Sequence, residues 1–350
     1  MNWRFTTDVL TTLAAGFRFS APNNVDPFRS PGKTIPDAVG PRTALRALAA
    51  ILRRSSLGAA TVSALDEPES KRLLLDLCAF RVAGGRHYRL PRNDAAFWRS
   101  VESVRTDLLV ERGVSRAGGY DLDLYRIPGA TGPIEFEAHP MNILNSFLIE
   151  EYRFARSGIV IEAGPRDIVV DAGGCWGDTA LYFADRAPSG KVFVFEFEEE
   201  NLEVLRRNLA RNPRLAGRIE IIERALWSTS GEKLTFADAG PGTKVRQQQE
   251  SAGGGEIESL SMDDWVGEAG IPRVDFIKMD IEGAEVPALM GSQRTIHAFM
   301  PTLAISIYHS IGDLLTIPRL LRQFDAAYEI HLAHATIHAE ETIAFATARR

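Results

Sequence analysis

Acidic residues and glycines lie close together in residues 168–186, whose sequence is IVVDAGGCWGDTALYFADR. An apolar run ends in Asp171, and helix-like periodicity begins at Asp178. Between these acids stand Gly173, Gly174 and Gly177. A glycine-rich turn between a strand and a helix lets the backbone approach a ligand closely. We therefore expect a ligand-binding turn here, with the three glycines and both acids among its contacts.

The charge of this turn predicts the class of ligand. A dinucleotide-binding turn follows the pattern G-x-G-x-x-G, and Ala172 stands where that pattern needs its first glycine. Two carboxylates at this turn would repel a pyrophosphate. They suit a ligand that carries an amine and a sulfonium, which Asp171 and Asp178 can hold directly or through water. We therefore predict S-adenosylmethionine as the cofactor.

A third acid stands at the end of the next apolar run. Glu196 follows Gly177 by nineteen residues and ends the run VFVFE. An acid at about this spacing in a nucleotide-binding unit accepts the ribose hydroxyls. The end of the third run, ERALWS, then offers Ala225 and Leu226 as flat apolar contacts for adenine.

Candidate catalytic residues follow the fourth and fifth apolar runs. Methyl transfer to a hydroxyl requires alignment of the acceptor and a base that takes its proton. Asp280 ends the run VDFIKMD, and Glu282 follows as the next helix begins. His309 ends the fifth run and titrates near neutrality, which makes it the best base on chemical grounds. Lys278 is expected to orient an acid or to stabilise a developing oxyanion.

Each candidate also has a structural interpretation. Asp280 and Glu282 can cap the helix that follows them, where acids favour the positive end of the helix dipole. His309 can be a structural histidine, Lys278 can pair with a neighbouring carboxylate, and Glu285 is expected on the surface of the helix start. Oxygen and nitrogen ligands suit magnesium or manganese. The spacing of these residues is not compact, so we predict no metal.

The elements that position these residues alternate between apolar runs and helical segments. The runs cover residues 167–172, 190–197, 218–226, 273–281 and 300–309, and the clearest helices cover 198–212 and 282–296. This alternation predicts parallel strands with helices on both faces. Residues 327–334 and 342–348 are joined by a few polar residues, so they are expected to pair antiparallel at one edge. The fold class is therefore α/β, a doubly wound, mostly parallel seven-stranded sheet with an antiparallel edge hairpin.

The first half of the chain is mixed and carries no chemical motif. Residues 41–54 and 67–80 have helical spacing, residues 119–127 and 132–138 alternate like a β-hairpin, and residues 140–155 read as a helix. We therefore predict two domains, a smaller α+β region of unknown role at 1–164 and the cofactor-binding domain at 165–350. The Gly- and Gln-rich segment 238–256 is expected to be a loop that closes over the substrate, together with Tyr152.

The composition excludes several classes of protein. The chain has 350 residues, a formal net charge of -6 and two cysteines, Cys78 and Cys175. Two distant cysteines indicate a reducing compartment, and no run approaches the roughly 20 apolar residues of a membrane span. Basic residues do not cluster, so nucleic acid is not an expected partner. We expect a cytoplasmic protein that acts on a small molecule, and the oligomeric state stays open.

Five stretches of the sequence resemble successive motifs of one family. They are DAGGCWGDTALYFA, GKVFVFEFEEENLEVLRRNLARN, LSMDDWV, VDFIKMDIEGAEVPALMGSQRTI and PTLAISIYH. They resemble FkbM-type methyltransferases, which are class I S-adenosylmethionine-dependent enzymes with a Rossmann-like sheet. The resemblance covers residues 167–348 and implies methylation of hydroxyl oxygens, typically on sugars or secondary metabolites. It also implies cofactor contacts at Asp171, Gly173, Gly177, Asp178, Thr179 and Glu196.

The sequence thus favours an O-methyltransferase that acts on a hydroxyl of a small molecule, sugar or glycoconjugate. Two alternatives from other classes remain. A nicotinamide-dependent oxidoreductase would share the sheet and Glu196, although Asp171 argues against it. A non-catalytic protein that binds S-adenosylmethionine would keep the glycine turn without needing Asp280, Glu282 and His309.

Overall fold

The computed structural model describes residues 2–19, 24, 26–28, 41–237, 242–247 and 255–348. The chain forms two compact units. One comprises Met1–Val101 and Ser306–Arg350, and the other comprises Glu102–Ile305. This division differs from the expected boundary between residues 164 and 165. The reason is that residues 102–164 build five strands and a helical segment that belong to the second unit.

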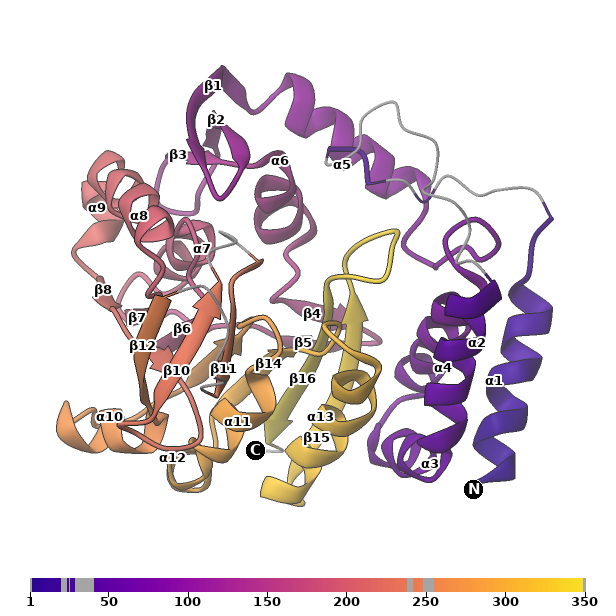
Figure 1. Cartoon of the computed structure of the whole chain (residues 1–350). Helices are drawn as coiled ribbons and strands as arrows, with labels where there is room; N and C mark the ends of the chain where they lie inside the picture. The colour runs from indigo at the N-terminus through magenta and orange to yellow at the C-terminus, as the bar shows by residue number, and fades with distance from the viewer. Residues whose placement is uncertain are drawn as a thin grey trace. The chain divides into compact units, whose positions relative to one another are not determined.

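The central sheet has seven strands in the order β15-β16-β14-β13-β6-β7-β8 and is mixed (Figure 1). Four strands of the second unit run parallel, namely β6 (Ile168–Ala172), β7 (Lys191–Phe195), β8 (Ile219–Ile222) and β13 (Phe276–Met279). β14 (Thr302–Ser306) also runs parallel to β13. These strands are nearly continuous apolar runs, as expected for strands that are covered on both faces.

Helices cover both faces of the sheet in the second unit. α7 (Asp178–Arg186) and α8 (Glu199–Arg211) lie on one face, where Phe183 packs on Phe276 with 5.3 Å between the ring centroids. α10 (Met262–Glu268) lies on the other face, because its Trp265 contacts both Phe193 and Phe195. Figure 1 shows these two layers above and below the strands. α9 (Pro213–Ala216) follows α8 in the chain.

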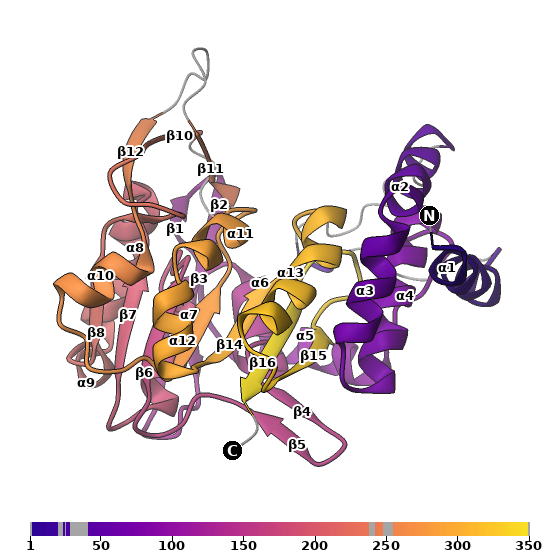
Figure 2. The same cartoon turned by 90° about the horizontal axis from the view of Figure 1, so that it is seen from below.

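Two expected elements differ from the structure in this unit. Residues 282–296 form two short helices, α11 (Glu285–Met290) and α12 (Gln293–Phe299), separated by Gly291 and Ser292. A second sheet of four strands, which the sequence pattern did not predict, has the order β11-β10-β12-β9 (Figure 2). Its strands are β9 (Ala225–Leu226), β10 (Lys233–Ala237), β11 (Lys244–Gln247) and β12 (Gly255–Leu260). β11 thus lies inside the segment 238–256 that was expected to be a loop, while residues 238–241 and 248–254 lie outside the described part of the chain.

A small antiparallel sheet precedes the glycine turn. Its strands are β1 (Leu109–Ala117), β2 (Tyr120–Ile127) and β3 (Ile134–Ala138), and the pairing of β2 with β3 confirms the expected hairpin. The helix expected at 140–155 is shorter and irregular. It consists of α6 (Pro140–Asn142) and a π-helix (Ile143–Ile149), followed by the hairpin β4 (Phe154–Arg156) and β5 (Ile159–Ile161).

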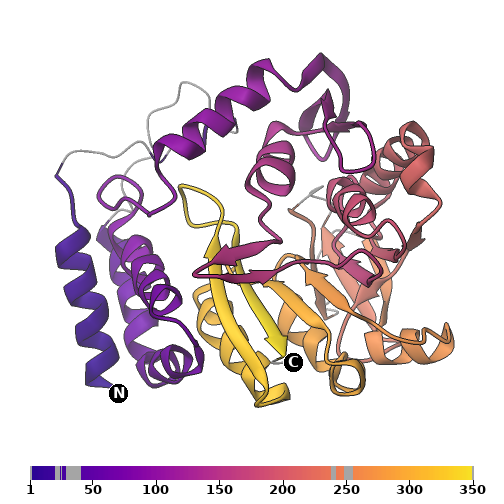
Figure 3. The ribbon, with the colours of Figure 1, turned by 180° about the vertical axis from the view of Figure 1, so that it is seen from behind.

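The first unit is mainly helical. It contains α1 (Trp3–Gly16), α2 (Pro41–Arg53), α3 (Ser55–Ala64) and α4 (Pro68–Ala83), and α5 (Ala95–Thr106) crosses into the second unit. Helices α1 and α4 lie side by side in Figure 3. α13 (Ile311–Phe324) and the antiparallel strands β15 (Tyr328–His334) and β16 (Thr342–Ala348) complete the unit, so the expected edge hairpin is confirmed.

Within the described residues, none of the helices is both long enough and apolar enough to cross a membrane.

Candidate functional site

The turn between β6 and α7 requires glycine at two positions. Gly173 has φ +84°, and a Cβ atom there would lie 1.9 Å from the carbonyl oxygen of Asp280. Gly177 has φ +86° at the N-cap of α7, against Leu205 of α8. Gly173 therefore combines a left-handed backbone with a contact that leaves no room for a side chain, and Gly177 combines the same backbone with tight packing on Leu205. We call residues 173–177 the glycine loop.

Backbone hydrogen bonds fix the glycine loop on β7. The amides of Gly173 and Gly174 both donate to the carbonyl oxygen of Phe195, at 2.9 and 3.1 Å. The amide of Cys175 donates to Oε2 of Glu196 at 2.9 Å. The loop is therefore anchored to the end of β7, at the carboxyl end of the sheet, where ligands bind in folds of this kind.

A buried ion pair supports the loop from the neighbouring strand. Nζ of Lys278 lies 2.9 Å from Oδ1 of Asp171 and also donates to the carbonyl oxygens of Ala172 and Gly173, at 3.1 and 2.6 Å. The hydroxyl of Thr179 donates to Oδ2 of Asp171 at 2.6 Å. Both oxygens of Asp171 are thus engaged inside the protein. The structure gives Lys278 and Asp171 a supporting position beneath the loop, and a direct contact of Asp171 with a ligand stays a prediction.

Asp178 also points into the protein. Its carboxylate accepts a hydrogen bond from the hydroxyl of Ser146 in the π-helix at 2.7 Å. Burial raises the pKa of Asp178, and the hydrogen bond from Ser146 partly offsets this effect. The π-helix, an element that is frequent at functional sites, therefore contacts the first residue of α7.

Glu196 is the acid at the end of β7, as the sequence predicts. Oε1 accepts hydrogen bonds from the amides of Phe197 and Glu198 at 2.8 and 2.9 Å, and Oε2 accepts the one from Cys175. Three amide donors hold the carboxylate in one orientation. Burial nevertheless raises the pKa of Glu196 to about 7, because desolvation outweighs these hydrogen bonds.

A pocket that is open to solvent lies at the end of β6, β7 and β13. Four of the predicted cofactor residues line it, namely Gly173, Glu196, Ala225 and Leu226. The other predicted cofactor residues, Asp171, Gly174, Gly177, Asp178 and Thr179, are buried in β6, the loop and α7. The pocket thus has a carboxylate on one wall and apolar residues on another, which suits a ribose and an adenine ring.

Sequence reasoning missed several residues that line this pocket. Asn201 in α8 and Phe197 are close to Glu196 in the chain, while Thr243 and Val245 come from β11 and the residue before it. Val245 and Phe197 belong to one apolar cluster with Ala225 and Trp227. The alternation of Val245 with charged neighbours in KVRQ was the only available signal, and the Gly-rich flanks of that stretch obscured it.

Two candidate catalytic carboxylates line the same pocket. Oδ2 of Asp280 accepts a hydrogen bond from the hydroxyl of Tyr152 at 3.1 Å. Glu282 has a left-handed backbone with φ +55°, and its Oε2 lies 3.8 Å from Nζ of Lys244. A non-glycine residue in this conformation is strained, and such strain is concentrated at functional sites. The contact with Asp280 places Tyr152 beside a candidate base. The tyrosine itself is buried, with 3% of its surface exposed.

Glu285 differs from its expected position. It is 0% exposed rather than on the surface, and its Oε1 accepts a hydrogen bond from the amide of Ile281 at 2.8 Å. The side chain folds back on the turn that precedes α11, so it holds the backbone between Asp280 and Glu282.

His309 belongs to the first unit. It follows β14, and its ring contacts that of Tyr308 with 4.1 Å between the centroids. Arg81 of α4 donates to the carbonyl oxygen of Tyr308 at 2.5 Å. Since Asp280, Glu282 and Lys278 belong to the second unit, the grouping of His309 with them stays a prediction.

The comparison with protein families agrees with this geometry. Residues 156–330, half of the chain, match the model described as Methyltransferase FkbM domain. The chain belongs to the FkbM methyltransferase family. Membership favours a methyltransferase over the nicotinamide-dependent oxidoreductase that the sequence left open. The FkbM match begins after β1, β2, β3 and the π-helix.

Relatives of known name are distant methyltransferases. Methyltransferase sdnD of Sordaria araneosa is 28% identical over 213 residues, which cover 52% of this chain and 81% of that protein. The hexuronic acid methyltransferase AglP of Haloferax volcanii is 25% identical and covers 48% of this chain and 67% of that protein. The 2-O-methyltransferase NoeI of Sinorhizobium fredii is 25% identical and covers 38% of this chain and 60% of that protein.

A solved structure shares the fold. The FkbM methyltransferase from Methylobacillus flagellatus aligns with a TM-score of 0.54 and 20% sequence identity. The alignment covers 85% of this chain and 60% of that one. At this identity the likeness supports the α/β methyltransferase fold alone.

Proposed function

We propose that this protein is an S-adenosylmethionine-dependent O-methyltransferase that acts on a hydroxyl of a small molecule, sugar or glycoconjugate. The observation that carries the proposal is Glu196, whose carboxylate is fixed by three amides in the wall of a pocket beside the glycine loop. An oriented carboxylate at the end of the second strand is the group that accepts ribose hydroxyls in nucleotide-binding units.

The residues that line the pocket support this choice of cofactor. Ala225 and Leu226 form an apolar wall for adenine, and Gly173 lines the same pocket, where its lack of a side chain lets the backbone of Asp280 pack closely against it. Three carboxylates, those of Glu196, Asp280 and Glu282, line the pocket together with one basic residue, Arg224. A ligand with a positive charge on sulfur and nitrogen complements the three carboxylates. S-adenosylmethionine supplies a methyl group on a sulfonium, which is an excellent leaving group.

The residues of the chain then have to orient the acceptor and take its proton. Asp280 is the base that we propose within the second unit, because it lines the pocket and its Oδ2 is held by the hydroxyl of Tyr152. With S-adenosylmethionine bound beside Glu196, the cofactor would supply the methyl group, and Asp280 would take the proton of the acceptor hydroxyl. His309 remains the second candidate for that base, on its chemistry and its position after β14.

The acceptor class is proposed from the relatives. NoeI is named a 2-O-methyltransferase and AglP a hexuronic acid methyltransferase. We propose a hydroxyl of a sugar or a similarly polar small molecule for this chain as well. Panels of hexoses and uronic acids, incubated with S-adenosylmethionine labelled in its methyl group, test this part of the proposal.

Calorimetric titration tests the cofactor directly. We expect S-adenosylmethionine to bind the wild-type protein with micromolar affinity and NADH not to bind. Glu196→Gln should lose binding, because an amide nitrogen would face the backbone amides that now donate to the carboxylate. Glu199→Gln is the matched control, since this glutamate is exposed on α8 and pairs with Arg206 outside the pocket. Binding of NADH alone, or equal binding by both variants, would contradict the proposal.

A further inference from the structure

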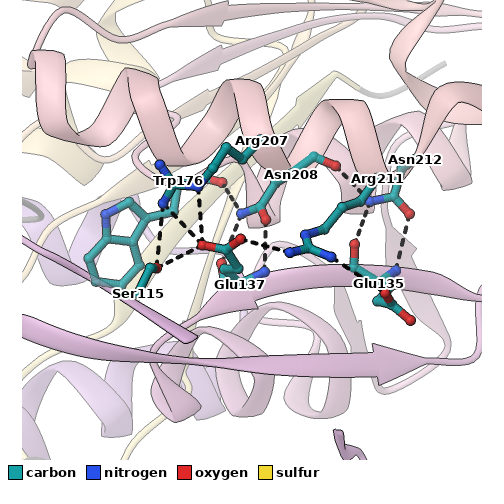
Figure 4. A network of polar contacts seen from close by, with 8 residues as sticks. All are labelled: Ser115, Glu135, Glu137, Trp176, Arg207, Asn208, Arg211 and Asn212. Carbon is teal, nitrogen blue, oxygen red and sulfur yellow. Dashed lines mark hydrogen bonds and ion pairs between the residues drawn. The ribbon is translucent and has the colours of Figure 1, made fainter. Parts of the chain in front are cut away.

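Asn208 of α8 and Asn212, the C-cap of that helix, cover the edge of the small sheet. The amide of Glu137 in β3 donates to Oδ1 of Asn208 at 2.7 Å, and Nδ2 of Asn208 donates back to the carbonyl oxygen of Glu137 at 2.8 Å. Asn212 makes the same pair of bonds with the backbone of Glu135, at 3.1 and 2.7 Å. Figure 4 shows the two side chains side by side, one helical turn apart. They satisfy backbone groups of an edge strand, which would otherwise be open to pairing.

Asn208 and Asn212 differ in their third hydrogen bond. Nδ2 of Asn208 also donates to the carbonyl oxygen of Trp176 in the glycine loop, at 2.9 Å (Figure 4). The corresponding bond of Asn212 goes to the carbonyl oxygen of Asn208, within α8 itself. An asparagine amide has two N–H donors, and in Asn208 one serves the strand and the other serves the loop. Asn208 therefore links β3, α8 and the glycine loop through one side chain.

The surroundings of Asn208 make this link rigid. Asn208 is 0% exposed and Trp176 is 1% exposed. The indole of Trp176 packs in a cluster with Ala117 and Leu122 of the small sheet and Val204 of α8. A buried amide and a buried carbonyl that lost their partners would keep the full cost of desolvation. If the bond between Asn208 and Trp176 were lost, neither group could form a replacement hydrogen bond with water.

A charged cluster beside Asn208 holds the strand on the helix. The carboxylate of Glu137 accepts hydrogen bonds from Arg207 at 3.0 Å, from Arg211 at 3.1 Å and from the hydroxyl of Ser115 at 2.7 Å (Figure 4). Burial favours the neutral form of Glu137 and by itself would raise the pKa of its carboxyl. These three donors outweigh burial, so the pKa lies below its usual value. The position of β3 relative to α8 is therefore fixed independently of Asn208.

We propose that Asn208 is a positioning residue for the cofactor-binding loop and that the small sheet β1-β2-β3 acts through it as part of the cofactor site. The sheet fixes Asn208, and Asn208 fixes the carbonyl of Trp176 next to Gly177 and Cys175. This inference rests on the proposed binding of S-adenosylmethionine at the glycine loop. It assigns a function to residues 109–138, which precede the segment that matches the family model.

The comparison of Asn208→Ala with Asn212→Ala tests the proposal. Each variant removes one amide pair with β3, but only Asn208→Ala removes the contact with the loop. We expect the affinity for S-adenosylmethionine, measured by calorimetry, to fall about 10-fold or more in Asn208→Ala, which corresponds to the loss of one buried hydrogen bond. In Asn212→Ala it should stay within about 2-fold of the wild type.

Hydrogen exchange adds a measurement that needs no cofactor. Deuterium uptake by the peptide that contains residues 173–181 should rise in Asn208→Ala and stay at the wild-type level in Asn212→Ala. If Asn208→Ala does not fold, Asn208→Ser replaces it, because a hydroxyl is too short to reach both the strand and the loop. Equal affinity and equal exchange in the two variants would overturn the inference. Failure of the wild type to bind S-adenosylmethionine would instead overturn the proposed function, while the exchange measurement would still test the link.

Discussion

Lys278 and Asp171 form an ion pair that is sealed inside the protein, with 2.9 Å between Nζ and Oδ1 and side chains that are 2% and 0% exposed. Burial lowers the pKa of Lys278, but the charge of Asp171 and the further charges of Asp280 and Asp178 outweigh it, so the pKa lies above its usual range. The lysine is therefore charged and bound to three acceptors at once. In this position it organises the carbonyls at the start of the glycine loop.

Removal of one partner of this pair should destabilise the protein strongly. We expect Lys278→Met to lower the free energy of unfolding by about 3–5 kcal/mol, because the carboxylate of Asp171 is left buried without its counter-charge. The double variant Lys278→Met with Asp171→Asn should be more stable than the sum of the single changes predicts. Urea unfolding of the four proteins measures both effects. Additive losses would show that the two side chains do not interact in solution.

Gly173 offers a test of close packing in the loop. Gly173→Ala introduces a methyl group against the carbonyl oxygen of Asp280, in addition to a backbone with φ +84°. Gly231 has φ +81°, and a Cβ there meets no atom within 4 Å. We expect Gly231→Ala to cost about 1–2 kcal/mol from its backbone alone, without an effect on cofactor binding. Gly173→Ala should cost more and abolish binding of S-adenosylmethionine in calorimetry. Similar results for both variants would mean that the contact with Asp280 is not tight.

Local spacing explains which parts of the site the sequence could predict. The glycine loop and Glu196 lie on consecutive elements of one strand-helix-strand unit, so their separation in sequence fixes their separation in space. Ala225 and Leu226 were found because they follow the next strand. Gly173, Cys175, Glu196, Ala225 and Leu226 line the pocket, while Gly174, Trp176 and Gly177 of the loop are buried and do not.

Contacts between distant segments explain what the sequence could not predict. Tyr152 contacts Asp280, which lies 128 residues further along the chain, and no sequence pattern in either segment indicates this contact. Asn208 has the spacing of an ordinary polar helix residue, although it is fully buried on β3. Glu285 was expected on the surface because an acid at a helix start usually faces water. Its side chain turns back to the amide of Ile281 instead, which the sequence does not encode in any periodicity.

The pKa of Glu196 predicts how cofactor affinity depends on pH. Burial raises this pKa from 4.5 to about 7 in the folded chain, so the folded state favours protonated Glu196. The stability of the fold that this protonation provides is fully present below pH 4.5 and is lost as the pH rises through about 7. Ribose hydroxyls donate to the ionised carboxylate. Affinity for S-adenosylmethionine should therefore rise with pH and level off above about 7, and at pH 6 it should be about 10-fold weaker than at pH 8.

Calorimetry at pH 6, 7 and 8 measures this dependence. Below pH 7 the binding of the cofactor should release a proton, which appears as a dependence of the heat on the ionisation enthalpy of the buffer. Any residual binding of the cofactor by Glu196→Gln should occur without the proton release that originates from Glu196. A wild-type affinity that stays constant from pH 6 to pH 8 would place the ribose elsewhere.

The contact of Tyr152 with Asp280 predicts a coupling between the two residues. Tyr152→Phe removes the hydroxyl that donates to Oδ2 at 3.1 Å and keeps the buried ring. A hydrogen bond to a charged acceptor contributes about 1.5–3 kcal/mol, so the coupling free energy from a double-variant cycle with Asp280→Asn should fall in that range. Urea unfolding gives the cycle. Because the ring also lies 5.5 Å from Nζ of Lys278, phenylalanine preserves that contact and isolates the hydroxyl. Once an acceptor is identified, Tyr152→Phe should lower kcat while the affinity for S-adenosylmethionine stays unchanged, since the tyrosine acts on the proposed base and not on the ribose. A coupling near zero would remove Tyr152 from the site.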